Sequence, residues 1–148
     1  MITSNSVRIP VPADVVWSVF ADVERWPTWT TSVTSIQPLD GAEIDVGRRF
    51  RIKQPRLPVL VWRVNDVEPG RSWTWTAGSA GARTYAAHEV QPDGDNAAVV
   101  TQRIDQRGPL GALFGMMTRR MTRRYLAVEA DGLKAASEEQ WHGAPQSQ

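Results

Sequence analysis

The most constraining feature of this chain is a series of short segments in which apolar and polar residues alternate. Alternation of this kind gives a β-strand one apolar and one polar face. Turn signals such as Asp40-Gly41, Pro69-Gly70 and Pro92-Asp93-Gly94 separate the segments. The spacing favours hairpins and therefore an antiparallel sheet. The sequence predicts about seven strands, over residues 6–11, 32–39, 47–53, 59–67, 72–77, 83–90 and 97–104.

Helical patterns follow the first strand and end the chain. Apolar residues at spacings of three and four predict an amphipathic helix from Pro12 to near Asp22. Pro27 disfavours helical geometry at the residue before it, so 24–29 is expected to form a bend or a short second helix. A long helix is predicted from Gly108-Pro109 to about Ser137, with an apolar stripe formed by Leu110, Phe114, Met117, Met121, Tyr125, Val128 and Ala135.

The order of these elements predicts an α+β fold. A long amphipathic helix after six antiparallel strands buries its stripe on the concave side of the sheet. We therefore expect Phe114, Met117, Met121 and Val128 to be buried there. The 148 residues are the length of one domain, expected over 1–140, with a polar, disordered tail over 141–148.

Composition removes several classes of protein. Without cysteine the chain has no disulfide scaffold, thiolate metal site or cysteine nucleophile. The longest apolar stretch, residues 110–117, is far too short to span a bilayer, so no stable membrane insertion is expected. The N-terminus has no signal-peptide pattern, and a cytoplasmic protein is expected.

Basic residues are concentrated in two segments. Residues 47–63 hold six basic residues and no acidic one, and residues 103–124 hold six arginines and one aspartate. They form either solvated faces or a pocket mouth that attracts an anion. A weak nucleic-acid surface is a third interpretation. The net charge of +1 and the lack of aromatic residues between the arginines argue against a nucleic-acid partner.

Five segments of the chain resemble one known superfamily. They are VPADVVWSVFADVERWPTW at 11–29, Gly47-x-x-Phe50, VNDVEPGRSWTW at 64–75, His88 in TYAAHEV, and EADGLKAASE at 129–138. Together they resemble the SRPBCC proteins, the START-like helix-grip superfamily, and within it the polyketide cyclase/dehydrase-type group. The resemblance implies a seven-stranded sheet curled around the C-terminal helix, two short helices after the first strand, and a cavity for an apolar ligand. Members include aromatase/cyclases and lipid and hormone carriers, so the resemblance implies no single chemistry.

A few residues are candidates for the site. His88 shares a small, mostly apolar strand face with Thr84, Ala86 and Val90; it suits either acid/base chemistry or a structural hydrogen bond. If the protein is an enzyme, the catalytic candidates are His88, Tyr125 and Arg124. Tyr125 is equally consistent with core packing, and Arg124 with solvent exposure. The predicted ligand-binding set is Trp29, Phe50, Trp62, Trp75, His88, Met117, Met121 and Tyr125.

The sequence leaves three hypotheses for function. The leading one is binding of a hydrophobic or aromatic small molecule, lipid- or polyketide-like, in a cavity of about 300–1,000 Å³. The alternative is an aromatase/cyclase or dehydratase acting on a polyketide-type substrate. The third is an interaction role for the basic segments. No metal or other cofactor is expected. The chain has only two histidines to bind a metal, and its sequence contains no phosphate-binding fingerprint. A monomer or a homodimer is expected.

Overall fold

The computed structural model describes residues 1–79 and 81–143, and within these ranges the chain forms a seven-stranded antiparallel sheet. The strand order is β1-β7-β6-β5-β4-β3-β2, so the first and last strands of the chain are neighbours. This confirms the predicted antiparallel sheet. The strands are β1 (Ile2–Ile9), β2 (Ser35–Pro38), β3 (Arg49–Lys53), β4 (Leu60–Glu68), β5 (Ser72–Ser79), β6 (Ala82–Pro92) and β7 (Ala98–Arg107).

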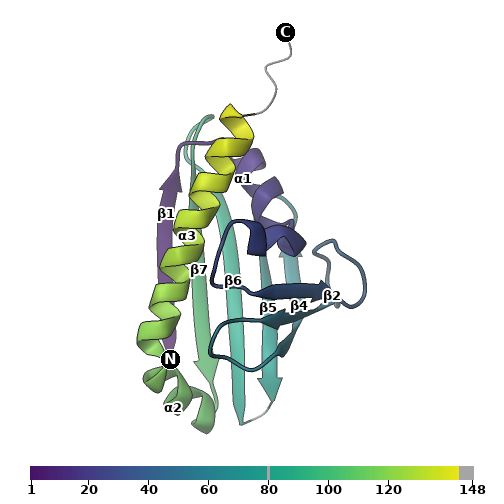
Figure 1. Ribbon diagram of the computed structural model, residues 1–148, viewed down its shortest axis with the longest axis vertical. Coiled ribbons are helices and arrows are strands. Elements are labelled where there is room, and N and C mark those ends of the chain that lie inside the picture. The colour runs from purple at the N-terminus through teal and green to yellow at the C-terminus, as the bar shows by residue number, and fades with distance from the viewer. Residues whose placement is uncertain (80, 144–148) are drawn as a thin grey trace.

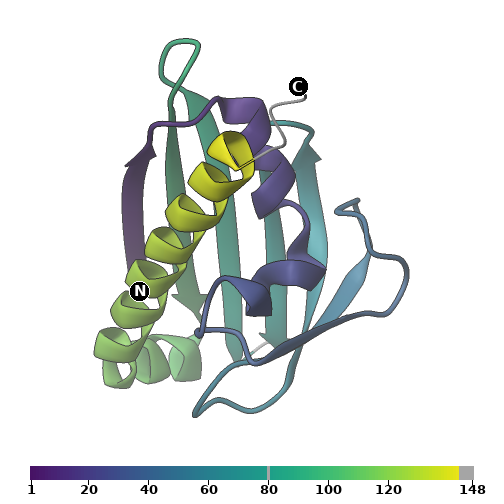
Figure 2. The same cartoon turned by 45° about the horizontal axis from the view of Figure 1, so that its top comes forward.

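Helices cover one face of this sheet. Figures 1 and 2 show the long C-terminal helix lying across the face, beside the two short helices that follow β1. The predicted α+β architecture is therefore confirmed. The helical elements are α1 (Ala13–Phe20), the 3₁₀ helix η1 (Val23–Thr28), α2 (Pro109–Met117) and α3 (Arg119–His142).

Five ring-bearing residues join α1 and η1 to the sheet, and we call them the aromatic cluster: Phe20, Trp26, Trp73, Trp75 and His88. The His88 ring stacks on Trp73 with centroids 4.2 Å apart, and Phe20 lies 5.0 Å from Trp73. The Trp26 indole donates a 2.8 Å hydrogen bond to the Phe20 carbonyl oxygen. All five side chains are buried, so the cluster combines apolar burial with aromatic pairs worth about 0.5–1.5 kcal/mol each.

The prediction of one continuous C-terminal helix was wrong. The helix is divided at Thr118, which has φ −104° and ψ 10° and separates α2 from α3. The Thr118 hydroxyl donates a 2.8 Å hydrogen bond to the Phe114 carbonyl oxygen, which occupies the acceptor at the end of α2. A threonine hydroxyl that bonds back four residues competes with regular helix geometry in this way.

The predicted buried stripe was also wrong over α2. Phe114 is 47 % exposed and Met117 is 76 % exposed, because α2 faces the sheet with Gly111 and Gly115. A Cβ added to Gly115 would lie 2.5 Å from the side-chain oxygen of Gln106, so any other residue there would displace that side chain. Met121 and Val128 are half-buried at the edge of α3. The buried face of α3 is instead formed by Leu126, Glu129, Ala130, Leu133 and Ser137.

The prediction of a disordered tail over 141–148 was wrong for its first two residues. Residues 141 and 142 belong to α3, and Trp141 packs partly buried against the core. Burial of this large apolar ring stabilises the end of the helix. The polar residues around Trp141 in the sequence gave no indication of it. Residues 144–148 lie outside the described residues.

Stability measurements can test which residues of the C-terminal helices are buried. Leu133 is 1 % exposed, so Leu133→Ala should lower the free energy of unfolding by about 2–5 kcal/mol. Met117→Ala removes a side chain of similar size from an exposed position and should change it by less than about 0.5 kcal/mol. Urea unfolding of both variants checks this, and similar losses in the two would contradict the assignment of the buried face.

Candidate functional site

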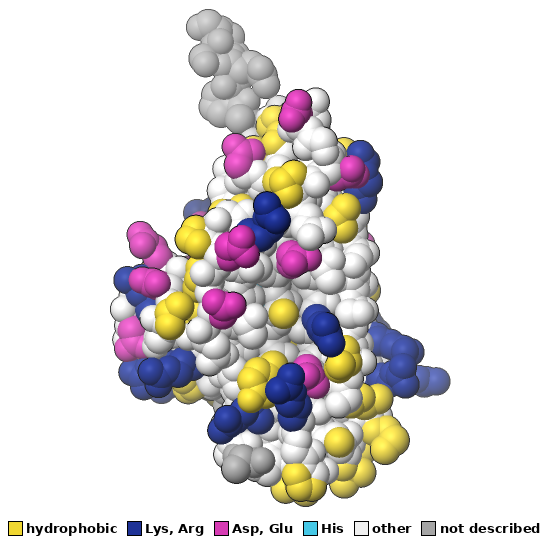
Figure 3. Space-filling view, turned by 180° about the vertical axis from the view of Figure 1, so that it is seen from behind, with side chains coloured by type: hydrophobic (Ala, Val, Ile, Leu, Met, Phe, Trp, Pro, Cys, Tyr) yellow, Lys and Arg dark blue, Asp and Glu magenta, His cyan; other side chains and the backbone are white. Residues whose placement is uncertain are grey.

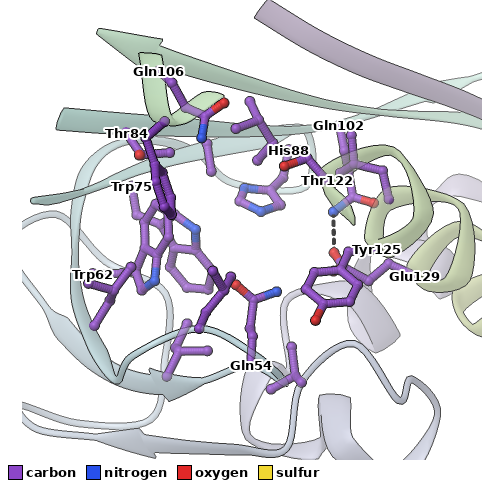
Figure 4. Close-up of a pocket in the computed structure, with 18 of the residues that line it drawn as sticks. Gln54, Trp62, Trp75, Thr84, His88, Gln102, Gln106, Thr122, Tyr125 and Glu129 are labelled. Carbon is purple, nitrogen blue, oxygen red and sulfur yellow. Dashed lines mark hydrogen bonds between the residues drawn. The ribbon is translucent and has the colours of Figure 1, made fainter. Parts of the chain in front are cut away.

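A cavity of about 360 Å³ lies between α3 and the sheet. Figure 4 shows its side chains converging from the strands, from α3 and from the β3–β4 loop. The α2 helix closes one end with Gly111 and Phe114. Its volume lies at the lower end of the range for small-ligand pockets. Its polar lining consists of Gln54, Thr84, His88, Gln102, Gln106, Thr122, Tyr125 and Glu129.

Strand alternation builds the floor of the cavity in rows. His88 on β6 pairs with Trp73 on β5 and with Gln102 on β7, at the end filled by the aromatic cluster. Further along, Ala86 pairs with Trp75, and Thr84 pairs with Ala77. Because residues two apart share one face of a strand, all of these side chains project toward the helices. The small side chains Ala86 and Thr84 leave open the space that larger residues would fill.

His88 is held in an uncharged form. Its ring is 3 % exposed, and Nδ1 lies 3.2 Å from the Trp73 carbonyl oxygen. Burial lowers the pKa of His88 from 6.5 to about 3, and the hydrogen bond to Trp73 opposes this to a smaller extent. A carbonyl oxygen only accepts hydrogen bonds, so Nδ1 carries the proton and Nε2 is left as an acceptor. Figure 4 shows the ring at the edge of the open space.

Glu129 on α3 is the buried acid of the cavity. It is 6 % exposed and accepts hydrogen bonds from Ser32 Oγ at 2.7 Å and from Gln102 Nε2 at 2.9 Å. Burial raises the pKa of Glu129 above 4.5, and the two hydrogen bonds oppose this rise. The network continues to Thr30, whose hydroxyl lies 2.8 Å from that of Ser32. Burial therefore disfavours the charged form of both titratable groups.

The β3–β4 loop forms the rim of the cavity through polar contacts. The Tyr125 hydroxyl donates a hydrogen bond to the Pro55 carbonyl oxygen, and Lys53 Nζ donates to the carbonyl oxygens of Gln54 and Leu57. Gln54 Nε2 donates to the Ser32 carbonyl oxygen at 3.2 Å. These contacts tie the loop to α3 and to the segment before β2, so the rim has a defined position.

The structure brings four of the predicted ligand-binding residues to the cavity: Trp62, Trp75, His88 and Tyr125. Phe50 is fully buried behind Trp75, with ring centroids 5.8 Å apart, and Trp29 packs against Trp26. Met117 and Met121 lie elsewhere, in a second hollow of about 530 Å³ that we call the arginine groove. Its lining also includes Arg56, Arg120 and the catalytic candidate Arg124, which is exposed.

Sequence reasoning missed several residues of the cavity, above all Glu129. A signal was present, because Glu129 follows Tyr125 by four residues and therefore shares its helix face. Gln102, Ile104 and Gln106 are each two residues apart on β7, which likewise places them on one face. Gln54 and Trp26 come from irregular or 3₁₀ segments, where no periodicity indicates direction.

Residues 1–79 and 81–143 bring together no group of three His, Asp or Glu side chains that could hold a metal ion. None of the helices in these ranges is long and apolar enough to cross a membrane.

A sheet that curls around a C-terminal helix and encloses a lined cavity defines the class of helix-grip proteins. Residues 2–138 match the family described as "Polyketide cyclase / dehydrase and lipid transport", and the chain belongs to this family. The family covers both enzymes and carriers.

Known proteins resemble the chain in sequence and in structure. A protein of Streptomyces halstedii named "Putative polyketide cyclase" is 29 % identical over 92 residues, which are 60 % of this chain and 73 % of that protein. The hypothetical protein jhp0584 of Helicobacter pylori has a TM-score of 0.79 at 16 % identity, over 93 % of this chain and 88 % of that one. Norcoclaurine synthase of Thalictrum flavum, in complex with dopamine and hydroxybenzaldehyde, has a TM-score of 0.73 at 13 % identity, over 94 % and 87 %. At these low identities, both structural similarities show a shared fold and nothing about activity.

The pKa of His88 leads to a testable dependence of stability on pH. The folded state keeps His88 uncharged, whereas the unfolded chain takes up a proton below about pH 6.5. The stability that His88 supplies is therefore present above pH 6.5 and is lost as the pH falls toward 3. Between pH 7 and pH 5 we expect wild type to lose about 2 kcal/mol more than His88→Gln, which does not titrate. Urea unfolding at the two pH values measures this; equal losses would contradict a buried, uncharged His88.

Proposed function

We propose that the chain binds a small molecule with an apolar, aromatic body and one or two uncharged polar groups. The observation that carries this proposal is the cavity of about 360 Å³, walled by Trp62 and Trp75 and lined by hydrogen-bonding side chains. Flat indole rings suit an aromatic ligand, and a few polar groups suffice to fix its orientation. The family description and the synthase solved with two small aromatic molecules support this class of ligand.

The electrostatics of the cavity favour an uncharged ligand. Burial favours the uncharged forms of His88 and Glu129, and Tyr125 is already engaged with the Pro55 carbonyl oxygen. Among the described residues, no arginine or lysine lines the cavity. A charged group brought into these surroundings would lose its hydration without gaining a partner of opposite charge.

Hydrogen bonds give the ligand its orientation. His88 Nε2 accepts a bond from a hydroxyl group, and the amides of Gln54 and Gln106 both donate and accept. Gln102 already donates a hydrogen bond to Glu129, so the two side chains are positioned before a ligand binds. A planar phenol, with the ring against Trp75 and the hydroxyl near His88, combines these features.

Titration with 2-naphthol, followed by quenching of tryptophan fluorescence, tests the proposal. We expect saturable quenching in wild type. Ala86→Phe places a ring in the open part of the cavity and should weaken binding at least tenfold. Ala87→Phe is the matched control, because the neighbouring residue on β6 faces the opposite side of the sheet and should leave affinity within about twofold. Absence of quenching, or equal effects of the two variants, would contradict binding in the cavity.

A second candidate function is cyclisation of a polyketide-type substrate, and the observation that favours it is that His88 and Glu129 line the same cavity. In such a step His88 Nε2 would take a proton from a carbon between two carbonyl groups. That carbon would attack a second carbonyl carbon, and Glu129 would give its proton to the oxygen of that carbonyl. The low pKa of His88 makes it a weak base, which is why binding is preferred.

Turnover measurements separate the two candidates. We expect poly-β-keto thioesters to bind without product formation, and His88→Gln to change affinity by about fivefold, the usual net effect of one hydrogen bond. If product forms, and both His88→Gln and Glu129→Gln lower its rate by roughly 10²–10⁴ with affinity nearly unchanged, the cyclase function replaces the binding function.

A further inference from the structure

The α2 helix exposes an unusual concentration of apolar side chains, which we call the apolar tip: Leu110, Leu113, Phe114, Met116 and Met117. These are five of the nine large hydrophobic side chains exposed in the described part of the chain, and each is 47–76 % exposed. Figure 3 shows hydrophobic side chains gathered at the lower end of the molecule, where Figure 1 places α2. Exposed clusters of this kind mark surfaces that bind another protein or a membrane.

The apolar tip is held outward by the packing of α2. Gly111 and Gly115 face the sheet, and Leu110 N donates a 3.0 Å hydrogen bond to the Gly81 carbonyl oxygen. A Cβ added to Gly111 would lie 3.4 Å from Ala82 Cα, so the helix backbone rests directly on the start of β6. With its small residues inward, α2 has no further face on which to bury its large ones.

Positive charge surrounds the apolar tip. Residues 106–128 contain five arginines and no acidic residue, and Arg119, Arg120, Arg123 and Arg124 at the start of α3 are exposed. Met117 shares the arginine groove with Arg56, Arg120 and Arg124, so the apolar and basic surfaces are continuous. Within residues 1–79 and 81–143, Arg107 pairs with Asp105 at 2.7 Å, whereas Arg56 and the four arginines at the start of α3 form no ion pair of 4 Å or less.

We propose that the apolar tip and the surrounding arginines dock the protein on an anionic lipid bilayer, with α2 inserted into the interface without spanning it. Short amphipathic elements insert about 5–10 Å into the boundary between headgroups and acyl chains, and flanking arginines attract anionic headgroups. The tip is a convex helix surface, which suits a deformable bilayer. A second copy of the chain suits it less, because a two-fold contact through α2 would bring the arginines of both copies together.

Docking through the apolar tip would also give a membrane-borne ligand a route into the cavity. Phe114 lines the cavity and is still 47 % exposed, so the side chain lies between the cavity and the outside. An apolar molecule that leaves the bilayer beside Phe114 would enter the cavity without crossing water. This part of the proposal rests on the proposed binding function, whereas docking itself does not.

Sedimentation with vesicles tests the docking of the protein without added ligand. We expect binding to vesicles of phosphatidylcholine containing about one third phosphatidylglycerol, and at least tenfold weaker binding to phosphatidylcholine alone or in high salt. The combined variant Leu113→Ser, Met116→Ser, Met117→Ser should weaken binding at least tenfold. Its control is Val46→Ser, which changes an exposed apolar residue on the β2–β3 loop.

A second pair of variants tests the charges. Arg120→Gln with Arg124→Gln should weaken binding by at least tenfold, while Arg25→Gln with Arg71→Gln makes the same change in net charge on other exposed elements and should have little effect. No sedimentation with anionic vesicles, equal sedimentation with neutral ones, or insensitivity to the α2 variant would overturn the proposal. A concentration-dependent dimer that the α2 variant abolishes would overturn it in favour of a second copy. Binding of 2-naphthol is measured separately, so failure of docking and failure of cavity binding are distinguishable.

Discussion

The aromatic cluster is the interaction on which the rest of the structure depends. Its residues come from α1, η1, β5 and β6, and its closest pair stacks His88 on Trp73 at 4.2 Å. The cluster fills one end of the space between the helices and the sheet. At the other end the inward positions of β6 are Ala86 and Thr84, which fill little of that space. The cavity is therefore the part of the core that the aromatic residues do not occupy.

Burial at this boundary fixes the chemistry of the site. His88 and Glu129 are both buried, which lowers the pKa of His88 and raises that of Glu129, and each is held by hydrogen bonds to neighbours. Buried polar groups without partners would be costly, and these hydrogen bonds satisfy both carboxyl oxygens of Glu129 and Nδ1 of His88 before a ligand arrives. A lining that is already ordered loses little entropy on binding, and this favours selection by shape and hydrogen bonding.

The sequence predicted the sheet well, because Trp73 and Trp75 alternate with threonines on β5 and turn residues separate the strands. It also placed His88, Trp62, Trp75 and Tyr125 near one another through parity and helix spacing. The prediction failed at α2, where large residues indicate a buried face and two glycines actually form it. The helix is also interrupted at Thr118, so the stripe could not be extended from α2 into α3. Glu129 was overlooked because acidic residues on helices are usually exposed, and only the contacts from Ser32 and Gln102 explain its burial.

The central claim is that the cavity holds an uncharged aromatic molecule between the tryptophan walls and the His88–Glu129 pair. A crystal structure of the protein grown with 2-naphthol tests this most directly. The account predicts electron density for the rings against Trp62 and Trp75, with the hydroxyl within hydrogen-bonding distance of His88 Nε2 or of Glu129. Density for naphthol only on the outer surface, with the cavity closed by its own side chains, would contradict it.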